Sequence, residues 1–202
     1  MKTIRAALAS FVLLSVLTGL IYPLIITGIA QVLFPFRANG SMITASGKAA
    51  PHAALACGSS LIGQTFNSPG YFWSRPSATT PMPYNAASSA ASNTGPSNPA
   101  LVTNVKARIA ALHAADPENH AAVPVDLVTS SGSGLDPDIS IGAALYQVGR
   151  VARVRHLPVA EVKRLVAHYE QGRSFGIFGE PCVNVLKLNL ALNRLAKAAP
   201  AR

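Results

Sequence analysis

The sequence is poor in cysteine and lacks the motifs of common active sites. Its two cysteines, Cys57 and Cys182, form no CxxC pair and no cluster with histidine, so a metal site is not expected. Whether they pair in an oxidising compartment depends on a proximity that the sequence does not show. GxSxG, HExxH and GxxxxGK(S/T) motifs are absent, and no pair of carboxylates has a spacing typical of acid–base catalysis. We therefore assign no catalytic residue and no metal ligand.

Acidic residues are missing from more than half of the chain. The sequence has 17 Lys and Arg but 8 Asp and Glu, which gives a net charge of +9, and all the acids lie between Asp116 and Glu180. A purely basic stretch suits contact with an anionic surface, such as lipid headgroups, nucleic acid or an acidic partner. Solubility alone explains the same charge equally well.

Charge is absent altogether from a long N-terminal run. No Asp, Glu, Lys or Arg occurs from Ala6 to Phe36, and about 20 apolar helical residues suffice to cross a bilayer. A cleaved signal peptide has a shorter apolar region, of about 7–15 residues, and a small-residue cleavage site, which this run lacks. The sequence therefore predicts a retained transmembrane anchor within residues 1–36.

Basic residues on either side of this run indicate its orientation. Lys2 and Arg5 precede it closely, whereas Arg37 and the more distant Lys48 follow it. Because positive charge is kept on the cytoplasmic side, we expect a cytoplasmic N-terminus and an extracytoplasmic remainder. That remainder divides into a linker at 37–56, rich in Ala, Ser and Gly, and one domain at 57–202 that is long enough to have its own core.

Small and polar residues recur every four positions within the predicted anchor. In an α-helix this spacing forms one slanted row, and membrane helices pack on each other along such rows. Chance is the alternative in a composition rich in small residues. The predicted packing residues are Ser15, Gly19, Pro23, Thr27 and Gln31.

The remainder is predicted to be an α+β domain, with helices packed on a small sheet. Aromatic enrichment and turn signals predict a two-stranded unit from 61–66 and 71–75. β-Branched residues predict a core strand at 123–129. Residues 183–192 alternate like a strand but also fit helical spacing, and we favour the helix.

Two Asx-Pro pairs predict helix starts, because Asn or Asp caps a helix whose first residue is proline. The first helix is expected from Asn98-Pro99 to Asp116, and the second from Asp136-Pro137 to about His156. Leu157-Pro158 then breaks the helical pattern, and a third helix is expected to run on to Gly172.

Three polar stretches leave alternatives open. The charge-free stretch 76–99 is either disordered, which its composition favours, or an ordered recognition loop. The arginine-rich helices around Leu157-Pro158 fit either a DNA-binding helix pair or a hairpin with solvated arginines, which we favour because Arg150, Arg153 and Arg155 do not share one face. The SGSG segment forms either an anion- or nucleotide-binding nest of backbone amides or an ordinary turn into a helix, which we favour. Its residues are Ser131, Gly132, Ser133, Gly134 and Asp136.

Five stretches of the chain together resemble one known family, the C subunit of the bacterial Kdp potassium-transporting ATPase. They follow one N-terminal span and cover nearly all of the domain, in the order expected for that family. Cys182, His52 and the Ala-rich linker are not part of the family's pattern. The matching stretches are GSSLIGQTF (58–66), YFWSRPSA (71–78), YNAASSAASNTGPSNPAL (84–101), VPVDLVTSSGSGLDPDIS (123–140) and GEPCVNVLKLNLAL (179–192).

The resemblance implies a non-catalytic subunit of a high-affinity, ATP-driven potassium uptake complex in the bacterial inner membrane. The implied partners are a channel-like potassium-binding subunit, a P-type ATPase subunit that hydrolyses ATP, and a small single-span subunit. In this family the subunit serves assembly and is described as a chaperone that raises the ATP affinity of the ATPase subunit. Potassium is then handled by the complex, and ATP is the one cofactor that the resemblance implies for this chain.

The resemblance also implies that the stretch 76–99 is ordered and that the domain is exported. No nucleotide motif is present, and an exported domain meets no cytoplasmic ATP, so the residues themselves favour a structural role. In that role the span packs in a helix bundle, and the domain caps the outer face of the channel-like subunit. Without the resemblance, the alternatives are a membrane-anchored DNA-binding regulator and an envelope binding module. The residues predicted to contact partners are Tyr71, Trp73, Arg75, Tyr84, Asn85, Asn93 and Asn98.

Overall fold

The computed structural model describes residues 2–198, with side-chain exposure described as far as Leu195. The chain forms two compact units, Met1–Met42 (unit 1) and Ile43–Arg202 (unit 2). Part of the segment predicted as a linker therefore belongs to unit 2, where Ile43 is 2% exposed and packs on Leu186 and Leu190. The functional boundaries at 36 and 56 stay a prediction.

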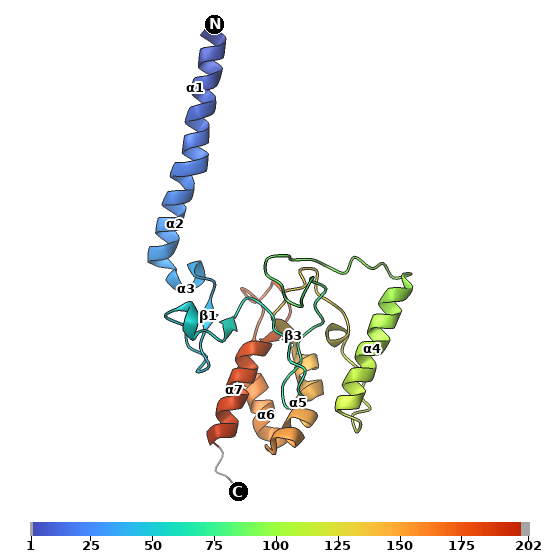
Figure 1. Ribbon diagram of the computed structural model, residues 1–202. Coiled ribbons are helices and arrows are strands. Elements are labelled where there is room, and N and C mark those ends of the chain that lie inside the picture. Colours follow the sequence, from blue (N-terminus) through green and yellow to red (C-terminus); the bar gives the residue numbers. More distant parts are fainter. Residues whose placement is uncertain (1, 199–202) are drawn as a thin grey trace. The chain divides into compact units, whose positions relative to one another are not determined.

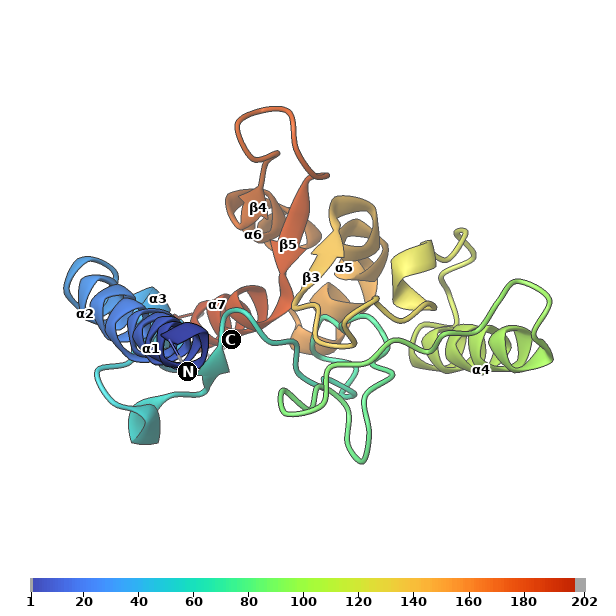
Figure 2. The same cartoon turned by 90° about the horizontal axis from the view of Figure 1, so that it is seen from above.

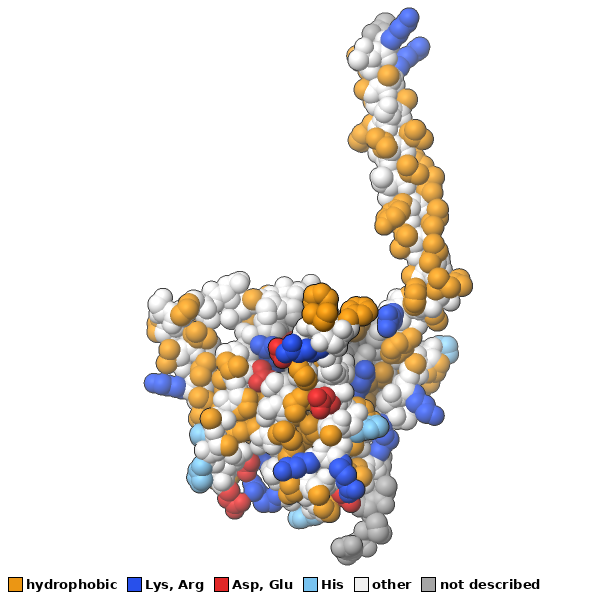
Figure 3. All heavy atoms as spheres, turned by 180° about the vertical axis from the view of Figure 1, so that it is seen from behind, with side chains coloured by type: hydrophobic (Ala, Val, Ile, Leu, Met, Phe, Trp, Pro, Cys, Tyr) orange, Lys and Arg blue, Asp and Glu red, His pale blue; other side chains and the backbone are white. Residues whose placement is uncertain are grey.

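Unit 1 is dominated by one apolar helix. It comprises α1 (Lys2–Val16), the π-helical segment η1 (Leu17–Ile21) and α2 (Tyr22–Leu33), and the short helix α3 (Pro35–Ala38) follows. The helix from Lys2 to Leu33 is long and apolar enough to cross a membrane, with a mean hydropathy of 2.2 and no buried residue. Figure 3 shows hydrophobic side chains along its length and basic side chains at its start.

The π-helical segment lies directly before Pro23. A proline ring inside a helix clashes with the carbonyl four residues earlier, here that of Gly19, and it donates no hydrogen bond to that carbonyl. Widening the turn over 17–21 relieves this clash. The regular spacing used to derive the row from Ser15 to Gln31 is therefore interrupted in its middle.

Unit 2 is built around a three-stranded antiparallel sheet with the order β3-β5-β4. The strands are β3 (Asp138–Ser140), β4 (Glu170–Gln171) and β5 (Cys182–Asn184), and Ile139 is paired with Val183. A second, two-stranded sheet joins β1 (Met42–Ile43) to β2 (Gly58–Ser59). The helices are η2 (Ala53–Leu55), α4 (Pro99–Ala115), η3 (Val125–Leu127), α5 (Ile141–Arg155), α6 (Val159–His168) and α7 (Val185–Ala198) (Figure 1).

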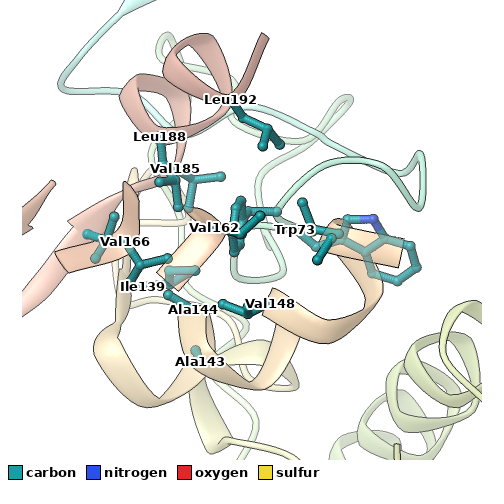
Figure 4. Close-up of a cluster of buried hydrophobic side chains, with 14 of the residues drawn as sticks. Trp73, Ile139, Ala143, Ala144, Val148, Val162, Val166, Val185, Leu188 and Leu192 are labelled. Atoms are coloured by element: carbon teal, nitrogen blue, oxygen red, sulfur yellow. The ribbon is translucent and has the colours of Figure 1, made fainter. Parts of the chain in front are cut away.

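The core lies where α5, α6 and α7 cover the three-stranded sheet. Small residues on α5 face branched ones on α6, so the two helices pack closely as a hairpin. Figure 4 shows these side chains gathered into one cluster beside Trp73. Its members include Ile139 of β3, Ala143, Ala144 and Val148 of α5, Val162 and Val166 of α6, and Val185, Leu188 and Leu192 of α7. The α+β class predicted from the sequence is confirmed.

The predicted helix start at Asn98-Pro99 is confirmed. The Asn98 side chain accepts a hydrogen bond from the Ala100 amide at 2.9 Å, and the helix ends at its C-cap Asp116. The break at Leu157-Pro158 is also confirmed, because His156 closes α5 in the left-handed conformation with φ 54°. The next helix ends at His168 rather than Gly172, because β4 takes up Glu170 and Gln171.

The helix start predicted at Asp136-Pro137 is wrong. The Asp136 carboxylate does accept a bond from the Asp138 amide, but this local turn leads into β3. The helix begins at Ile141, because Ser140 is its cap and accepts from the Ala143 amide at 3.0 Å. Residues 138–140 pair with β5 instead, and this pairing moves the helix cap from Asp136 to Ser140.

Two strand predictions are also wrong. Within 123–129 the chain forms the single 3-10 turn η3, whose Asp126 carboxylate accepts from the Ser140 amide at 2.7 Å. Segments 61–66 and 71–75 are not strands. In the second segment, side chains of other elements bind the backbone in place of a partner strand. In 183–192, Val183 and Asn184 belong to β5, and α7 takes the rest, as favoured.

Candidate functional site

The segment 69–75, here called the threaded segment, starts in a turn at Pro69 and Gly70 and then runs through unit 2 without a neighbouring strand among the described residues. Two buried amides replace that strand. The Asn189 side chain of α7 bonds both to the Phe72 amide and to the Phe72 carbonyl, at 2.9 Å each. The Gln147 side chain of α5 does the same for Trp73, at 2.7 and 3.2 Å. Each amide therefore imitates one rung of a β-ladder.

Arginines bind the remaining carbonyls of the threaded segment. Arg150 of α5 donates to Pro69 and Tyr71, and it also donates to the Gln147 side chain at 2.6 Å. Its burial lowers the pKa of Arg150 to about 10. The full series of side-chain donors is Arg150 to Pro69, Arg155 to Gly70, Arg150 to Tyr71, Asn189 to Phe72, Gln147 to Trp73, Arg108 to Ser74 and Tyr84 to Arg75.

The indole of Trp73 lies against two of these arginines. The guanidinium carbons of Arg108 and Arg150 are 5.1 and 4.9 Å from its ring centroid, and the indole N–H donates to the Ser68 carbonyl at 3.0 Å. Trp73 is 6% exposed. It therefore serves the interior of unit 2, where the cationic groups stack on its ring, and its side chain offers little surface to a partner.

The arginines considered for DNA binding are largely used within the fold. Arg150 and Arg155 bind the threaded segment, and Arg153 forms ion pairs with Asp116 and with Glu118, the latter at 2.8 Å. Because of these contacts, the three arginines do not form a free basic face on α5. The hairpin prediction of solvated arginines is therefore only half right, since one of these arginines is buried and one half-buried.

Beyond the threaded segment, the loops 76–90 and 130–137 meet in a region that we call the loop junction. Arg75 and Asp136 form an ion pair across it at 3.0 Å. The Tyr84 hydroxyl donates to the Arg75 carbonyl, and burial raises the pKa of this phenol. The Ser77 hydroxyl donates to the Gly134 carbonyl at 2.7 Å and accepts from the Tyr84 amide at 2.9 Å. The loop 76–90 is thus ordered by named bonds.

Two glycines are required at the loop junction. Gly134 has φ +68°, and a Cβ there would lie 2.6 Å from the Ala90 carbonyl oxygen. A Cβ on Gly63 would lie 2.4 Å from the Tyr84 ring and 2.7 Å from the Asp136 carbonyl oxygen. The backbones therefore approach too closely for any side chain, which fixes the relative placement of these loops.

Two shallow hollows open at the loop junction. One of about 250 Å³ is lined by residues that include Arg75, Tyr84 and Arg108, and one of about 540 Å³ lies between Leu61 and the SGSG turn. Neither shows a nucleophile beside a base. No group of three metal-ligating side chains occurs among the described residues. The chemistry that these lining residues offer is hydrogen bonding.

The SGSG turn uses its own amides. The Ser131 hydroxyl accepts from the Gly134 amide at 2.9 Å, and the Ser133 hydroxyl accepts from the Leu135 amide at 3.1 Å. A strand, not a helix, follows the turn, so no helix dipole points toward it. Ser133 also accepts from the loop 76–90, through the Ala90 amide and the Ser89 hydroxyl at 3.0 Å each. Gly132 is exposed.

The other residues predicted to contact partners have separate roles in the structure. Tyr71 stacks with Arg155 at 4.4 Å, and the Asn85 side chain bonds its own loop at Thr80 and Ala87. Asn93 is exposed, with φ 51°, and Asn98 caps α4. Of the predicted contact residues, the structure brings together Arg75 and Tyr84, beside Asp136 of the predicted anion turn, and it leaves Asn93 and Asn98 exposed.

The residues of the membrane row are all exposed in unit 1. Apart from its chain neighbours and the adjacent backbone of its own helix, no heavy atom of the described residues lies within 4 Å of the site that a Cβ on Gly19 would take. The Gln31 side chain accepts from the Asn39 side chain at 3.1 Å, which partly satisfies its amide. The row therefore has room for a neighbour at Gly19.

Sequence reasoning missed the residues that hold the threaded segment. Gln147 and Asn189 are each 1% exposed among apolar neighbours. A polar residue on the apolar face of a predicted helix was the available signal, since a buried amide requires partners. Its partner, a lone extended backbone, has no signature of its own.

Comparison with known proteins places the chain in context. The family model for KdpC, described as the c chain of K+-transporting ATPase, matches residues 4–194. A potassium-transporting ATPase KdpC subunit from Dechloromonas aromatica is 59% identical over 98% of this chain and 100% of its own length. Similar subunits from Ralstonia nicotianae and Janthinobacterium sp. are 58% and 57% identical, over 95% and 96% of this chain and 91% and 98% of their own lengths.

Proposed function

Since this chain belongs to the KdpC family of potassium-transporting ATPase subunits, we propose that it is a non-catalytic subunit that assembles and stabilises the complex. The observation that carries the proposal is the match over nearly the full length, anchor and domain together. The Kdp partners that we propose are the channel-like potassium-binding subunit, the P-type ATPase subunit and the small single-span subunit. The geometry of unit 2 supports a rigid scaffold, because its buried polar groups bind the chain's own backbone.

We propose further that the domain lies outside the cytoplasm of a bacterial inner membrane. Lys2 and Arg5 at the start of the apolar helix support this orientation. Cys57 is a natural probe, because it is exposed and free. In a Cys182→Ala variant, an impermeant maleimide added to intact spheroplasts is expected to label Cys57. Labelling only after lysis would place the domain in the cytoplasm, and the Cys57→Ala/Cys182→Ala chain gives the background.

Within the membrane, the proposed contact with partner helices is the row Ser15, Gly19, Pro23, Thr27 and Gln31. Gly19 is the sharpest probe, since glycine lets two helices approach closely and a larger side chain meets nothing within this chain. Gly19→Leu is expected to reach the membrane but to lose its co-purifying partners and growth at low external potassium. Leu20→Ala is the neighbouring control and should assemble normally. An intact complex in Gly19→Leu would show that the row is accidental.

Outside the membrane, we propose that the charge-free loop 80–98 caps the channel-like subunit. It is mostly exposed, and it is held at its base by Ser77 and by the loop junction. A loop fixed in this way offers backbone and small polar side chains to a partner without a large loss of entropy on binding. Within the assembled complex, the loop amides should be protected from hydrogen exchange, and the exposed face of α6 should not be.

For ATP, the family role as a chaperone of nucleotide affinity finds little support in this chain's own geometry. The Gly134 and Leu135 amides already donate to the hydroxyls of Ser131 and Ser133. Calorimetry on the full chain in detergent is expected to show weak or no ATP binding. Micromolar binding that inorganic phosphate does not mimic and that Ser131→Ala/Ser133→Ala abolishes would establish a nucleotide site there.

A further inference from the structure

Three of the four most exposed large apolar side chains among the described residues of unit 2 stand together at one place. The loop between β4 and β5 carries Phe175, Ile177 and Phe178, which are 94%, 70% and 67% exposed. Figure 2 shows this loop projecting from the body of unit 2. We call residues 174–178 the hairpin tip. Single exposed apolar residues are ordinary on protein surfaces, but three within four positions indicate an interaction site.

The hairpin tip is an ordered structure. The Ser174 amide donates to the Phe178 carbonyl at 2.8 Å, and the Phe178 amide donates back to the Ser174 carbonyl at 3.0 Å. Gly176, with φ +73°, makes the turn between them. Below the tip, Arg173 binds both carboxylate oxygens of Glu180 at 2.8 Å. The apolar side chains therefore project from a closed turn that rests on an ion pair.

These bonds suit an apolar solvent. The amides of Ser174, Gly176, Ile177 and Phe178 all donate within the loop, so moving the tip out of water leaves few amide donors unsatisfied. The charges of Arg173 and Glu180 remain at the base and neutralise each other. Aromatic residues above a polar base are typical of groups that sit at a membrane interface.

The length of the chain keeps unit 2 near the bilayer. The apolar helix ends at Leu33, and unit 2 begins at Ile43. The connecting chain can span at most roughly 35 Å, since each residue adds about 3.3–3.6 Å when extended. Ile43 packs on Leu186 and Leu190 of α7, and α7 follows directly from β5, the second strand of the hairpin. The tether and the hairpin thus join the same part of unit 2.

A protein partner is the less suitable occupant. A specific protein interface covers about 800 Å² on each side, whereas two phenylalanines and one isoleucine contribute less than about 600 Å², at 150–250 Å² for each aromatic residue. The tip offers no polar side chain beyond Ser174 to give such an interface specificity.

We propose that the hairpin tip inserts into the bilayer surface and acts as a second, lipid-facing anchor for unit 2. This inference rests on the membrane anchoring proposed above. With the span and the tip both held, the domain has a fixed orientation toward the membrane. The loop 80–98 is then presented to partners in one pose instead of many.

The test uses a fluorescent probe at two matched positions. In the full-length Cys57→Ala/Cys182→Ala chain, Ile177→Cys and Val125→Cys each receive an NBD group. Both native side chains are β-branched and 70% exposed, so they differ only in location. The labelled chains are reconstituted into phosphatidylethanolamine–phosphatidylglycerol vesicles containing doxyl-labelled lipid. Fluorescence of the single Trp73, recorded before labelling, checks that each variant folds.

We expect a blue-shifted emission and several-fold stronger lipid quenching at residue 177 than at residue 125. Equal quenching at the two sites would overturn the proposal. So would a probe at residue 177 that, in the assembled complex, is shielded from both doxyl lipid and aqueous iodide, because the tip would then be bound to a partner subunit. Alkaline extraction of the unlabelled chain separately tests the transmembrane span. Release of the chain from the vesicles by this treatment would contradict the proposed membrane anchor itself, and not only the role of the hairpin tip.

Discussion

On α7, Leu188 and Asn189 are neighbours and are equally buried, at 0% and 1% exposure, but they stabilise the fold in different ways. Leu188 packs in the apolar cluster under the helices (Figure 4). Asn189 bonds the backbone of Phe72, more than a hundred residues away. The helical core is thus held by area removed from water, and the threaded segment by individual hydrogen bonds. An apolar core tolerates small changes in side-chain shape, because its stability depends on the total area buried. The threaded segment depends on each side chain that binds its backbone.

Replacing Asn189 by leucine should have the largest effect. Asn189→Leu keeps the volume approximately but leaves the Phe72 amide and carbonyl without partners in the interior. Each unsatisfied buried group costs about 1–3 kcal/mol, so a loss of about 4 kcal/mol in the free energy of unfolding is expected. Urea unfolding of the full chain in detergent, followed by Trp73 fluorescence, measures it. A variant as stable as the wild type would mean that water replaces the amide.

The adjacent apolar residue provides the matched comparison. Leu188→Ala removes buried methyl groups and should cost about 3 kcal/mol, within the range of about 2–5 kcal/mol for such core truncations. Leu188→Met, which retains the volume, should recover most of that loss. No hydrocarbon should recover the loss at Asn189, but Asn189→Asp should do so in part at a pH low enough to protonate it, because the neutral carboxyl can accept from the Phe72 amide and donate to the Phe72 carbonyl. If Asn189→Leu lost no more unfolding free energy than Leu188→Met, the proposed difference between the two regions would not exist.

The same difference explains what the sequence could predict. Helices α4 and α6, the break at Leu157-Pro158 and the class of fold follow from local spacing and caps, which act within a few residues. The threaded segment does not, since Gln147 is 74 positions from Trp73 and no periodicity links them. Its aromatic residues have the composition of a strand. The sequence pattern therefore predicted a paired strand where the structure has none. The expected turn from SGSG into a helix was wrong for a similar reason, because pairing between β3 and β5 takes up residues 138–140 and moves the cap to Ser140.

For the candidate site, sequence resemblance identified the family, while the roles of single residues needed coordinates. Trp73 has the chemistry of a contact residue, but two arginines and its own backbone enclose it. Arg150 looks like a solvent-facing charge in its sequence context, but its pKa is lowered to about 10 because it is buried. Such assignments depend on neighbours from distant segments.

At the loop junction, a serine makes a contact of intermediate strength. Ser77→Ala removes the donor to the Gly134 carbonyl and the acceptor for the Tyr84 amide. Because this site is only half-buried, water can replace part of the loss, and about 1–2 kcal/mol is expected. The effect should be local, so hydrogen exchange should speed up in the loop 76–90 and remain unchanged in α5 and α6. Ser92→Ala, on the exposed part of the loop, is the control. Uniform acceleration throughout unit 2 would show that the loop is coupled to the core.

The smallest expected effect concerns Asp138, which links the strand region to the loop junction. Burial raises the pKa of this carboxyl above its usual 3.8, the opposite of a well-paired acid, although Asn184 donates to it at 3.0 Å. Between pH 3.8 and the higher folded pKa, the unfolded chain ionises while the folded chain keeps its proton. The folded state then binds more protons, so this group's contribution to stability falls as the pH rises through that window, and is constant above it.

Asp138→Asn should remove this fall while retaining an oxygen for the Asn184 amide. The melting temperature of the variant, relative to the wild type, should therefore be higher at pH 7 than at pH 4, by an amount smaller than any change at Asn189 or Ser77. Differential scanning fluorimetry at the two pH values measures it, and Glu170→Gln, at an exposed position on β4, controls for general charge effects. A variant that loses stability specifically at pH 7 would show that the charged form of Asp138 is favoured by Asn184 beyond the cost of its burial. In that case the charged Asp138 would stabilise the fold through its bond with Asn184, as the Arg75–Asp136 ion pair does at the loop junction. The strand region would then depend on single polar contacts, as the threaded segment does.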